Sequence, residues 1–414
     1  MKQLFTSIDE RQGEIIQSLQ KMIQIPSPTY QEGKLAAFLE EQLQSIGMET
    51  FTNRIGDVTG IHKGSSDDES LFVLNTHLDQ ADAGDMEDAF SGKILDGSVF
   101  GVSGEVVYGR GANGQKACLA AMIAAAQAVI DAGIELPRGF AINAGVMEEC
   151  GGHLSPEYLL NEDKMPIFAV LCGEHTDLKP VNGQRGMLHV YLKIEGKGSH
   201  AAAPEGSSSA LTGMARVILM LEELSRDLPK DAVYGDALVS LNRLFVTPNV
   251  INAIPDICEG VIDIRHPASL PREEIVPVVQ KQIAEVVAQQ AGLSHTAEIR
   301  KQAVKSYTGM EGLSDGGMYP CYTPTDDPLV DALGNSIQEV TGRKPEPELW
   351  SISSEAGYFS TVAGLPVVSF GPGEDRFTHN RNEHVRVEDV IITTKVYAAM
   401  ILKQCASYSG KGGG

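Results

Sequence analysis

Helix-period and strand-period hydrophobic patterns alternate along most of this chain. The spacing of apolar residues in 9–24 predicts an amphipathic helix. The run 70–76, with four consecutive apolar residues at its centre, predicts a buried strand, and 140–147 and 167–172 are also predicted as buried strands. Between them, 117–132 follows a glycine-rich turn and predicts an apolar, buried helix. Buried strands that alternate with helices are typical of an α/β protein.

The pattern changes near residue 186. Apolar and polar residues alternate over 187–195, which predicts a strand with one solvated face. Helical stretches at 208–225 and 271–291 and a strand at 260–265 complete an α+β unit, after which patterns of the first type resume and end in a strand at 365–370. The predicted domains are a catalytic domain in two parts, 1–185 and 306–408, an inserted domain, 186–305, and a flexible tail, 409–414.

Composition narrows the class of protein and of partner. The 414 residues, 42% of them hydrophobic and 21% charged, can bury one large core or two smaller ones. A net charge of −22 would repel nucleic acid and anionic lipid, so neither is predicted as a partner. The sequence has neither a secretory signal pattern nor a run of about eighteen apolar residues, so we expect a cytoplasmic protein without a membrane partner.

Histidines and acids follow the predicted buried strands in sequence. They are His77 with Asp79, the pair Glu148 and Glu149, Glu174, and, after the strand at 365–370, His379. Ligands bind at the carboxyl ends of strands in open α/β sheets, so we expect these side chains to converge. Imidazole and carboxylate are zinc ligands, and amide hydrolysis needs an activated water, a Lewis acid and a base. This set therefore predicts a metal-dependent hydrolase.

Together these motifs resemble the zinc-dependent exopeptidase and deacylase family that includes acetylornithine deacetylase, succinyl-diaminopimelate desuccinylase, aminoacylase and glutamate carboxypeptidase. The resemblance runs from the first helix to Val390. It implies an α/β, mixed-sheet, metallopeptidase-type catalytic domain split by an inserted α+β lid and dimerisation domain. It further implies a homodimer, a small N-acyl amino acid or short peptide as substrate, and one or two divalent metals per chain. Zinc is the favoured metal, with manganese and cobalt as alternatives.

The same resemblance assigns roles to residues. Glu148 corresponds to the general base, Asp79 to the carboxylate that orients His77, and His200, in the segment 196–204, to a histidine that reaches the partner's site and stabilises the oxyanion. The implied metal ligands are His77, Glu149, Glu174 and His379. The implied substrate contacts are Asn252 and Arg265. For these last two, a turn and an ion pair with a nearby acid are the structural alternatives.

One position departs from the family's pattern. The family's turn reads Gly-Arg-Gly-x-x-Asp-x-Lys, and its aspartate bridges two metals; here 109–116 reads Gly-Arg-Gly-Ala-Asn-Gly-Gln-Lys, so Gly114 holds the bridging position. Each metal would keep one histidine and one glutamate, below the three protein ligands of catalytic zinc, so a single metal is favoured. Asn113 is a candidate neutral oxygen ligand. The open alternatives are a natural one-metal centre, an inactivating substitution, and a noncatalytic small-molecule-binding protein of the same fold.

Two other classes of enzyme draw on the same segments. A dinucleotide-dependent oxidoreductase would use the Gly-x-Gly-x-x-Gly of the turn, formed by Gly109, Gly111 and Gly114. Its ribose-binding acid would have to end the next strand, but Asp131, at the expected separation, falls inside a predicted helix. A serine hydrolase would use the hydroxyls near Glu355, those of Ser351, Ser353 and Ser354. They lack the Gly-x-Ser-x-Gly pattern of a nucleophile elbow.

Overall fold

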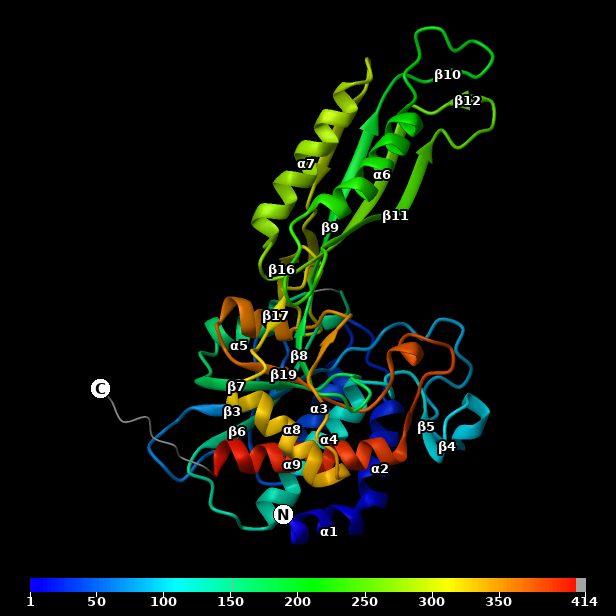
Figure 1. The fold of residues 1–414 in the computed structure, drawn as a ribbon. Helices are drawn as coiled ribbons and strands as arrows, with labels where there is room; N and C mark the ends of the chain where they lie inside the picture. Colours follow the sequence, from blue (N-terminus) through cyan, green and yellow to red (C-terminus); the bar gives the residue numbers. More distant parts are fainter. Residues whose placement is uncertain (151, 407–414) are drawn as a thin grey trace, which may run out of the picture.

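A mixed β-sheet forms the centre of the larger lobe in the computed structural model, which describes residues 1–150 and 152–406 (Figure 1). The predicted tail 409–414 lies outside the described residues. The strand order is β1-β2-β6-β3-β7-β19-β8-β17, and β18 pairs with β8. The strands are β1 (Glu49–Thr52), β2 (Val58–His62), β3 (Leu71–His77), β6 (Gly139–Gly145), β7 (Ile167–Cys172), β8 (Val181–Gln184), β17 (Cys321–Tyr322), β18 (Glu348–Trp350) and β19 (Val367–Ser369). Because β3 is parallel to β6 and β7, and β19 is parallel to β7, their carboxyl ends meet at one edge.

Both faces of this sheet are covered. Along β3, Phe72 and Leu74 pack into the main core, whereas Leu71 and Val73 pack into a second cluster on the other face. The helices of this lobe are α1 (Lys2–Glu10), α2 (Gln12–Ile23), α3 (Gly33–Ser45), α4 (Gln115–Asp131), α5 (Leu154–Asn161), α8 (Pro328–Thr341) and α9 (Val387–Cys405). A small antiparallel sheet beside them contains β4 (Lys93–Asp96), β5 (Glu105–Tyr108) and β20 (His384–Arg386). The predicted α/β fold with a mixed sheet is confirmed.

A second lobe stands off from the first and has its own core (Figure 1). Its antiparallel sheet has the order β11-β13-β9-β14, and the buried residues of β9 alternate with partly exposed ones, as the sequence pattern predicts. Its elements are β9 (Gly186–Glu195), α6 (Ala210–Asp227), β11 (Leu238–Thr247), β13 (Ile257–His266), α7 (Arg272–Ala288) and β14 (Ser294–Glu298). The short strands β10 (Ser199–His200) and β12 (Ala253–Ile254) lie at the end of this lobe farthest from the central sheet (Figure 1). Of the helices in the described residues, none combines the length and apolarity needed to cross a bilayer.

Candidate metal centre

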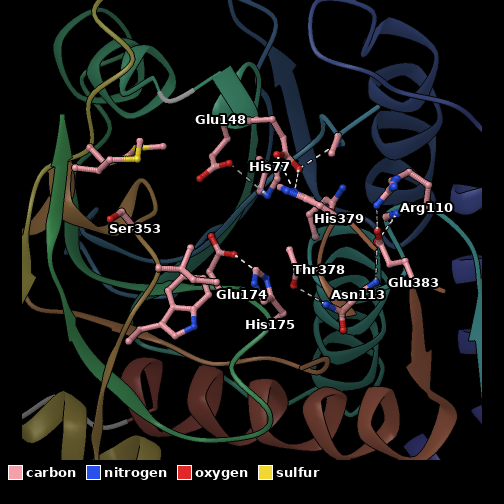
Figure 2. A pocket seen from close by; sticks show the side chains of 18 residues that line it. His77, Arg110, Asn113, Glu148, Glu174, His175, Ser353, Thr378, His379 and Glu383 are labelled. Carbon is pink, nitrogen blue, oxygen red and sulfur yellow. Dashed lines mark hydrogen bonds and ion pairs between the residues drawn. The ribbon is translucent and has the colours of Figure 1, made fainter. Parts of the chain in front are cut away.

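The predicted base and the four predicted metal ligands line one cavity at the carboxyl edge of the central sheet (Figure 2). His77 is the last residue of β3, Glu148 and Glu149 follow β6, and Glu174 follows β7. His379 comes from the segment between β19 and β20. The parallel strands therefore bring together residues that are far apart in the sequence.

Three buried carboxylates hold the segment 146–149, which carries Glu148 and Glu149. Four consecutive backbone N–H groups donate to them, with acceptors Asp57 Oδ1 at 3.0 Å, Glu32 Oε1 at 3.3 Å, Asp79 Oδ1 at 3.0 Å and Asp79 Oδ2 at 3.0 Å. Burial raises the pKa of both Glu32 and Asp57 to about 7. The backbone positions of the two glutamates are therefore held by these buried carboxylates.

Asp79 also fixes the ring of His77. Its Oδ1 lies 3.2 Å from His77 Nδ1, which leaves Nε2 toward the cavity, 3.9 Å from Glu148 Oε2. Burial acts to lower the pKa of His77, but the nearby carboxylates of Glu148 and Asp79 outweigh it and raise the pKa well above its usual value. Burial raises the pKa of Glu148 well above its usual range and that of Glu174 to about 7. This is the geometry of a metal-binding histidine with its orienting carboxylate, next to an acid suited to proton transfer.

Glu149 and His379 bind each other directly. His379 Nε2 lies 3.1 Å from Glu149 Oε2, and the N–H of Ala81 donates to Glu149 Oε1 at 3.1 Å. Burial acts to raise the pKa of Glu149, but the hydrogen bond with His379 lowers it overall. The same hydrogen bond raises the pKa of His379. These two predicted ligands therefore form an ion pair, apart from His77 and Glu174.

The turn 109–116 closes around Glu383, a residue that the sequence analysis missed. Arg110 forms a buried ion pair with Glu383, and the N–H groups of Gly111 and Asn113 donate to Glu383 Oε1 at 2.6 Å and 3.3 Å. These N–H groups are therefore not free to bind a pyrophosphate. The preceding strand, β5, pairs antiparallel with β4 and β20, whereas a dinucleotide-binding turn leaves a parallel sheet. The oxidoreductase alternative is wrong.

Gly114 has a backbone conformation that only glycine adopts readily, with φ 129° and ψ −117°. A Cβ at this position would lie 3.3 Å from His175 Nδ1. The neighbouring Asn113 is fully used elsewhere, because its Oδ1 accepts from Glu374 N–H at 2.8 Å and its Nδ2 donates to Thr378 Oγ1 at 2.8 Å. A role for Asn113 as a neutral oxygen ligand therefore stays a prediction, and these hydrogen bonds count against it.

His175, which the sequence analysis also missed, lies against this turn and lines the cavity (Figure 2). It is 8% exposed. Its Nδ1 lies 3.8 Å from Glu174 Oε2, and its Nε2 makes no hydrogen bond but lies 3.6 Å from Asp375 Oδ1. Burial lowers the pKa of His175 to about 4, so the ring is neutral at pH 7. The only signal for it in the sequence is its position directly after Glu174.

Three other predicted site residues lie outside this cavity. His200, on β10, and Asn252, which precedes β12, are at the far end of the smaller lobe, where the backbone oxygen of Asn252 accepts from Ala201 N–H at 2.9 Å. Arg265, on β13, pairs with Asp263 at 2.8 Å, the structural alternative that its sequence context allowed. Within a single chain, none of the three reaches the cavity.

The serine hydrolase alternative fails on geometry. Ser353 Oγ donates to the backbone oxygen of Arg185 at 2.8 Å, and Ser354 Oγ donates to Gln184 Oε1 at 2.9 Å. Neither hydroxyl is paired with a histidine that could act as its base, so both serines serve to fix the chain near the cavity.

The side chains that line the cavity are of the types that bind a divalent cation, but they lie farther apart than the ligands of a bound ion. In the part of the chain that the structure describes, no three His, Cys, Asp or Glu side chains are gathered tightly enough to form a ready coordination sphere. However, imidazoles and carboxylates from several elements open on one cavity. Burial and mutual repulsion raise the pKa of Glu148 and Glu174, and a bound cation would compensate this concentration of negative charge.

Comparisons with known proteins identify the family and confirm the fold. Residues 73–403 match the model of Peptidase family M20/M25/M40. The uncharacterized protein YgeY of Escherichia coli strain K12 is 25% identical over 425 aligned residues, which cover 98% of each chain. Succinyl-diaminopimelate desuccinylase of Acinetobacter baumannii is 23% identical, over 92% of this chain and 96% of that protein. The crystal structure of the M20 family metallo-carboxypeptidase Sso-CP2 from Sulfolobus solfataricus has the same fold, with a TM-score of 0.74 and 16% identity over 94% of this chain and 98% of that one.

Proposed function

Because the chain belongs to peptidase family M20/M25/M40, we propose that it is a metal-dependent hydrolase that cleaves the amide or peptide bond of a small N-acyl amino acid or a short peptide. The observation that carries this proposal is the buried Glu148 carboxyl, which faces the cavity 3.9 Å from His77 Nε2. Relatives named as a desuccinylase and as a metallo-carboxypeptidase support cleavage of a C–N bond.

His77 and Glu174 are the residues that would hold the cation, and zinc is the favoured metal, with manganese or cobalt as alternatives. When bound, the cation makes a water more acidic and polarises the carbonyl of the substrate. Glu148 takes the proton from the attacking water and delivers it to the departing amine, a role that its raised pKa suits. The side chains of Met187, Met318, Trp350 and Ile352 also line the cavity and suit an apolar portion of the substrate.

A homodimer is part of this proposal. His200 lies on β10, at the end of the smaller lobe farthest from the central sheet (Figure 1). A role for His200 at the oxyanion therefore requires a second copy of the chain, whose smaller lobe would bring its own His200 to the cavity.

A catalytically impaired or noncatalytic binding protein of the same fold is the second candidate. Two observations favour it. Gly114 has no side chain that could bind a metal, and Glu149 and His379 form an ion pair with each other, with Oε2 and Nε2 3.1 Å apart. Such a protein would bind a cation or a small molecule without turning it over.

The two candidates are separated by elemental analysis of the purified protein together with turnover of a panel of N-acyl amino acids and dipeptides. We expect about one divalent metal per chain and chelator-sensitive hydrolysis. Glu148→Gln should keep the metal and lose about 10²-fold or more in rate, because the general base is gone while the ligands remain. The matched control is Glu157→Gln, an acid on α5 outside the cavity, which should leave both unchanged. Metal without turnover of any substrate would favour the binding protein, and an unchanged rate in Glu148→Gln would remove that residue from the mechanism.

A further inference from the structure

We propose that the imidazole of His175 is a metal ligand that replaces the carboxylate missing at Gly114. The proposal rests on the metal-dependent function inferred above and deepens it, since it identifies the third protein ligand of a one-metal centre. His77 and Glu174 are the other two.

The first argument is the space at Gly114. A Cβ added to this glycine would lie 3.3 Å from His175 Nδ1 and 3.8 Å from His175 Cβ, so the ring fills the volume into which an aspartate at 114 would project. Contacts with other residues hold both the turn and the ring in place. Glu383 accepts from the N–H groups of the turn, and Trp350 contacts the ring edge-on, with centroids 5.0 Å apart. The imidazole at 175 therefore borders the space that a side chain at 114 would enter.

The second argument is the environment of the two ring nitrogens. His175 is 8% exposed, and its buried Nε2 makes no hydrogen bond. The group near Nε2 is the carboxylate of Asp375, which leaves Nδ1, next to the Glu174 carboxylate, as the nitrogen that can bind a cation. Asp375 Oδ1 lies 3.6 Å from Nε2. That carboxylate is placed to orient the ring with Nδ1 toward the cavity, as Asp79 does for His77 in reverse.

The third argument is the distance to Glu174. His175 Nδ1 lies 3.8 Å from Glu174 Oε2. Two ligands of a tetrahedral zinc, each about 2.1 Å from the ion, are about 3.4 Å apart, so a small closure would place both on one cation. With His77 the cation would have three protein ligands and an open position, which is the usual arrangement in catalytic zinc sites. Glu149 and His379 would then keep their ion pair.

The test compares metal binding by variants of His175, with Zn²⁺ affinity measured against a chromophoric chelator and Co²⁺ used as a spectroscopic probe. His175→Ala should bind Zn²⁺ about 100-fold or more weaker, since even the loss of a residue that only orients a ligand costs about 10–100-fold. It should also weaken the visible absorption of tetrahedral Co²⁺. His175→Asn should retain part of the affinity because its Oδ1 lies where Nδ1 does, whereas His175→Gln, which mimics Nε2, should not.

The matched control is His153→Ala. His153 is also a largely buried imidazole, but it stacks on Tyr358 outside the cavity. It should bind metal as the unchanged protein does. Thermal unfolding without metal separates loss of a ligand from loss of the fold, and His175→Asn keeps a polar side chain of similar reach if the alanine variant does not fold.

The outcomes separate this inference from the proposed function. If the unchanged protein binds Zn²⁺ and His175→Ala binds it with the same affinity and the same Co²⁺ spectrum, the inference is overturned and the hydrolase proposal stands. If His175→Ala loses the metal but no substrate is turned over by the unchanged protein, the ligand assignment stands and the hydrolase proposal fails. If the unchanged protein binds no divalent metal, both are wrong.

Discussion

Restoring the family's carboxylate through Gly114→Asp should have two opposed effects. Gly114 has φ 129°, and holding a residue with a side chain in such a region costs about 1–3 kcal/mol. The new Cβ would also lie 3.3 Å from His175 Nδ1, so the ring must move by a few tenths of an ångström. Unfolding entropy of about 2.1 cal/mol/K per residue converts this cost to a drop of about 1–4 °C in the unfolding midpoint of the metal-free protein. The added carboxylate should at the same time raise metal content from about one toward about two per chain.

Gly114→Ala is the control that separates these effects, because it introduces the same backbone strain and the same Cβ without a ligand. We expect both variants to lose similar stability in the presence of chelator, and only Gly114→Asp to take up additional metal, measured by elemental analysis after dialysis against Zn²⁺. In Gly114→Asp with His175→Ala the contact at the ring is removed, so this double variant should be more stable than the sum of the single effects. An alanine variant as stable as the unchanged protein would refute the strain argument. An aspartate variant with no more metal than the alanine variant would refute the assignment of Gly114 as an empty ligand position.

Two further predictions concern pH and assembly. Folding raises the pKa of Asp57 from the usual 3.8 to about 7, so the folded protein binds a proton more tightly than the unfolded chain does. The free energy of unfolding should therefore rise as pH falls from about 7 to about 4, by about 1.4 kcal/mol per pH unit from this group. Urea titrations should show that Asp57→Asn lacks this increment, and parallel pH curves for the two proteins would contradict the prediction. If His200 acts in the partner's site, mixing inactive Glu148→Gln with impaired His200→Ala should restore about a quarter of the wild-type rate. Half of the randomly mixed dimers contain one chain of each variant, and each of these dimers has one intact site out of two. If native mass spectrometry confirms subunit exchange and the rate does not recover, His200 lies outside the mechanism.

Much of the fold follows from hydrophobic period, because the elements around the site are buried and their patterns are strong. The apolar run at 70–76 becomes β3, and the alternation at 187–195 becomes β9, each within one residue of the prediction at either end. The helix predicted at 9–24 is α2, Gln12–Ile23, whereas residues 9 and 10 end α1 and Arg11, with φ −98° and ψ 10°, breaks the regular structure between the two helices. Periodicity records which side faces the core and not where the backbone turns.

The sequence likewise predicted some residues of the site and missed others. The convergence of the predicted ligands on one cavity was predictable because each follows a buried strand, and the carboxyl ends of parallel strands converge. Glu383 and His175 were not, because their importance depends on neighbours from other segments: the N–H groups of the turn for Glu383, and the empty space at Gly114 for His175. The hydrogen bonds of Asn113 could not be predicted for the same reason, since its amide is bound to the segment 374–378, 261 or more residues away in sequence.

Two departures separate this cavity from the family's two-metal pattern. Gly114 stands where that pattern has the shared ligand, and Glu149 and His379, the predicted ligands of a second metal, pair with each other. On the side of His77, by contrast, the orienting Asp79 and the neighbouring Glu148 are in place. Hydrolysis needs one Lewis-acidic cation and one base, and the residues proposed to supply both, His77 with Asp79 and Glu148, are in place, so the altered turn is compatible with the proposed single-metal hydrolase.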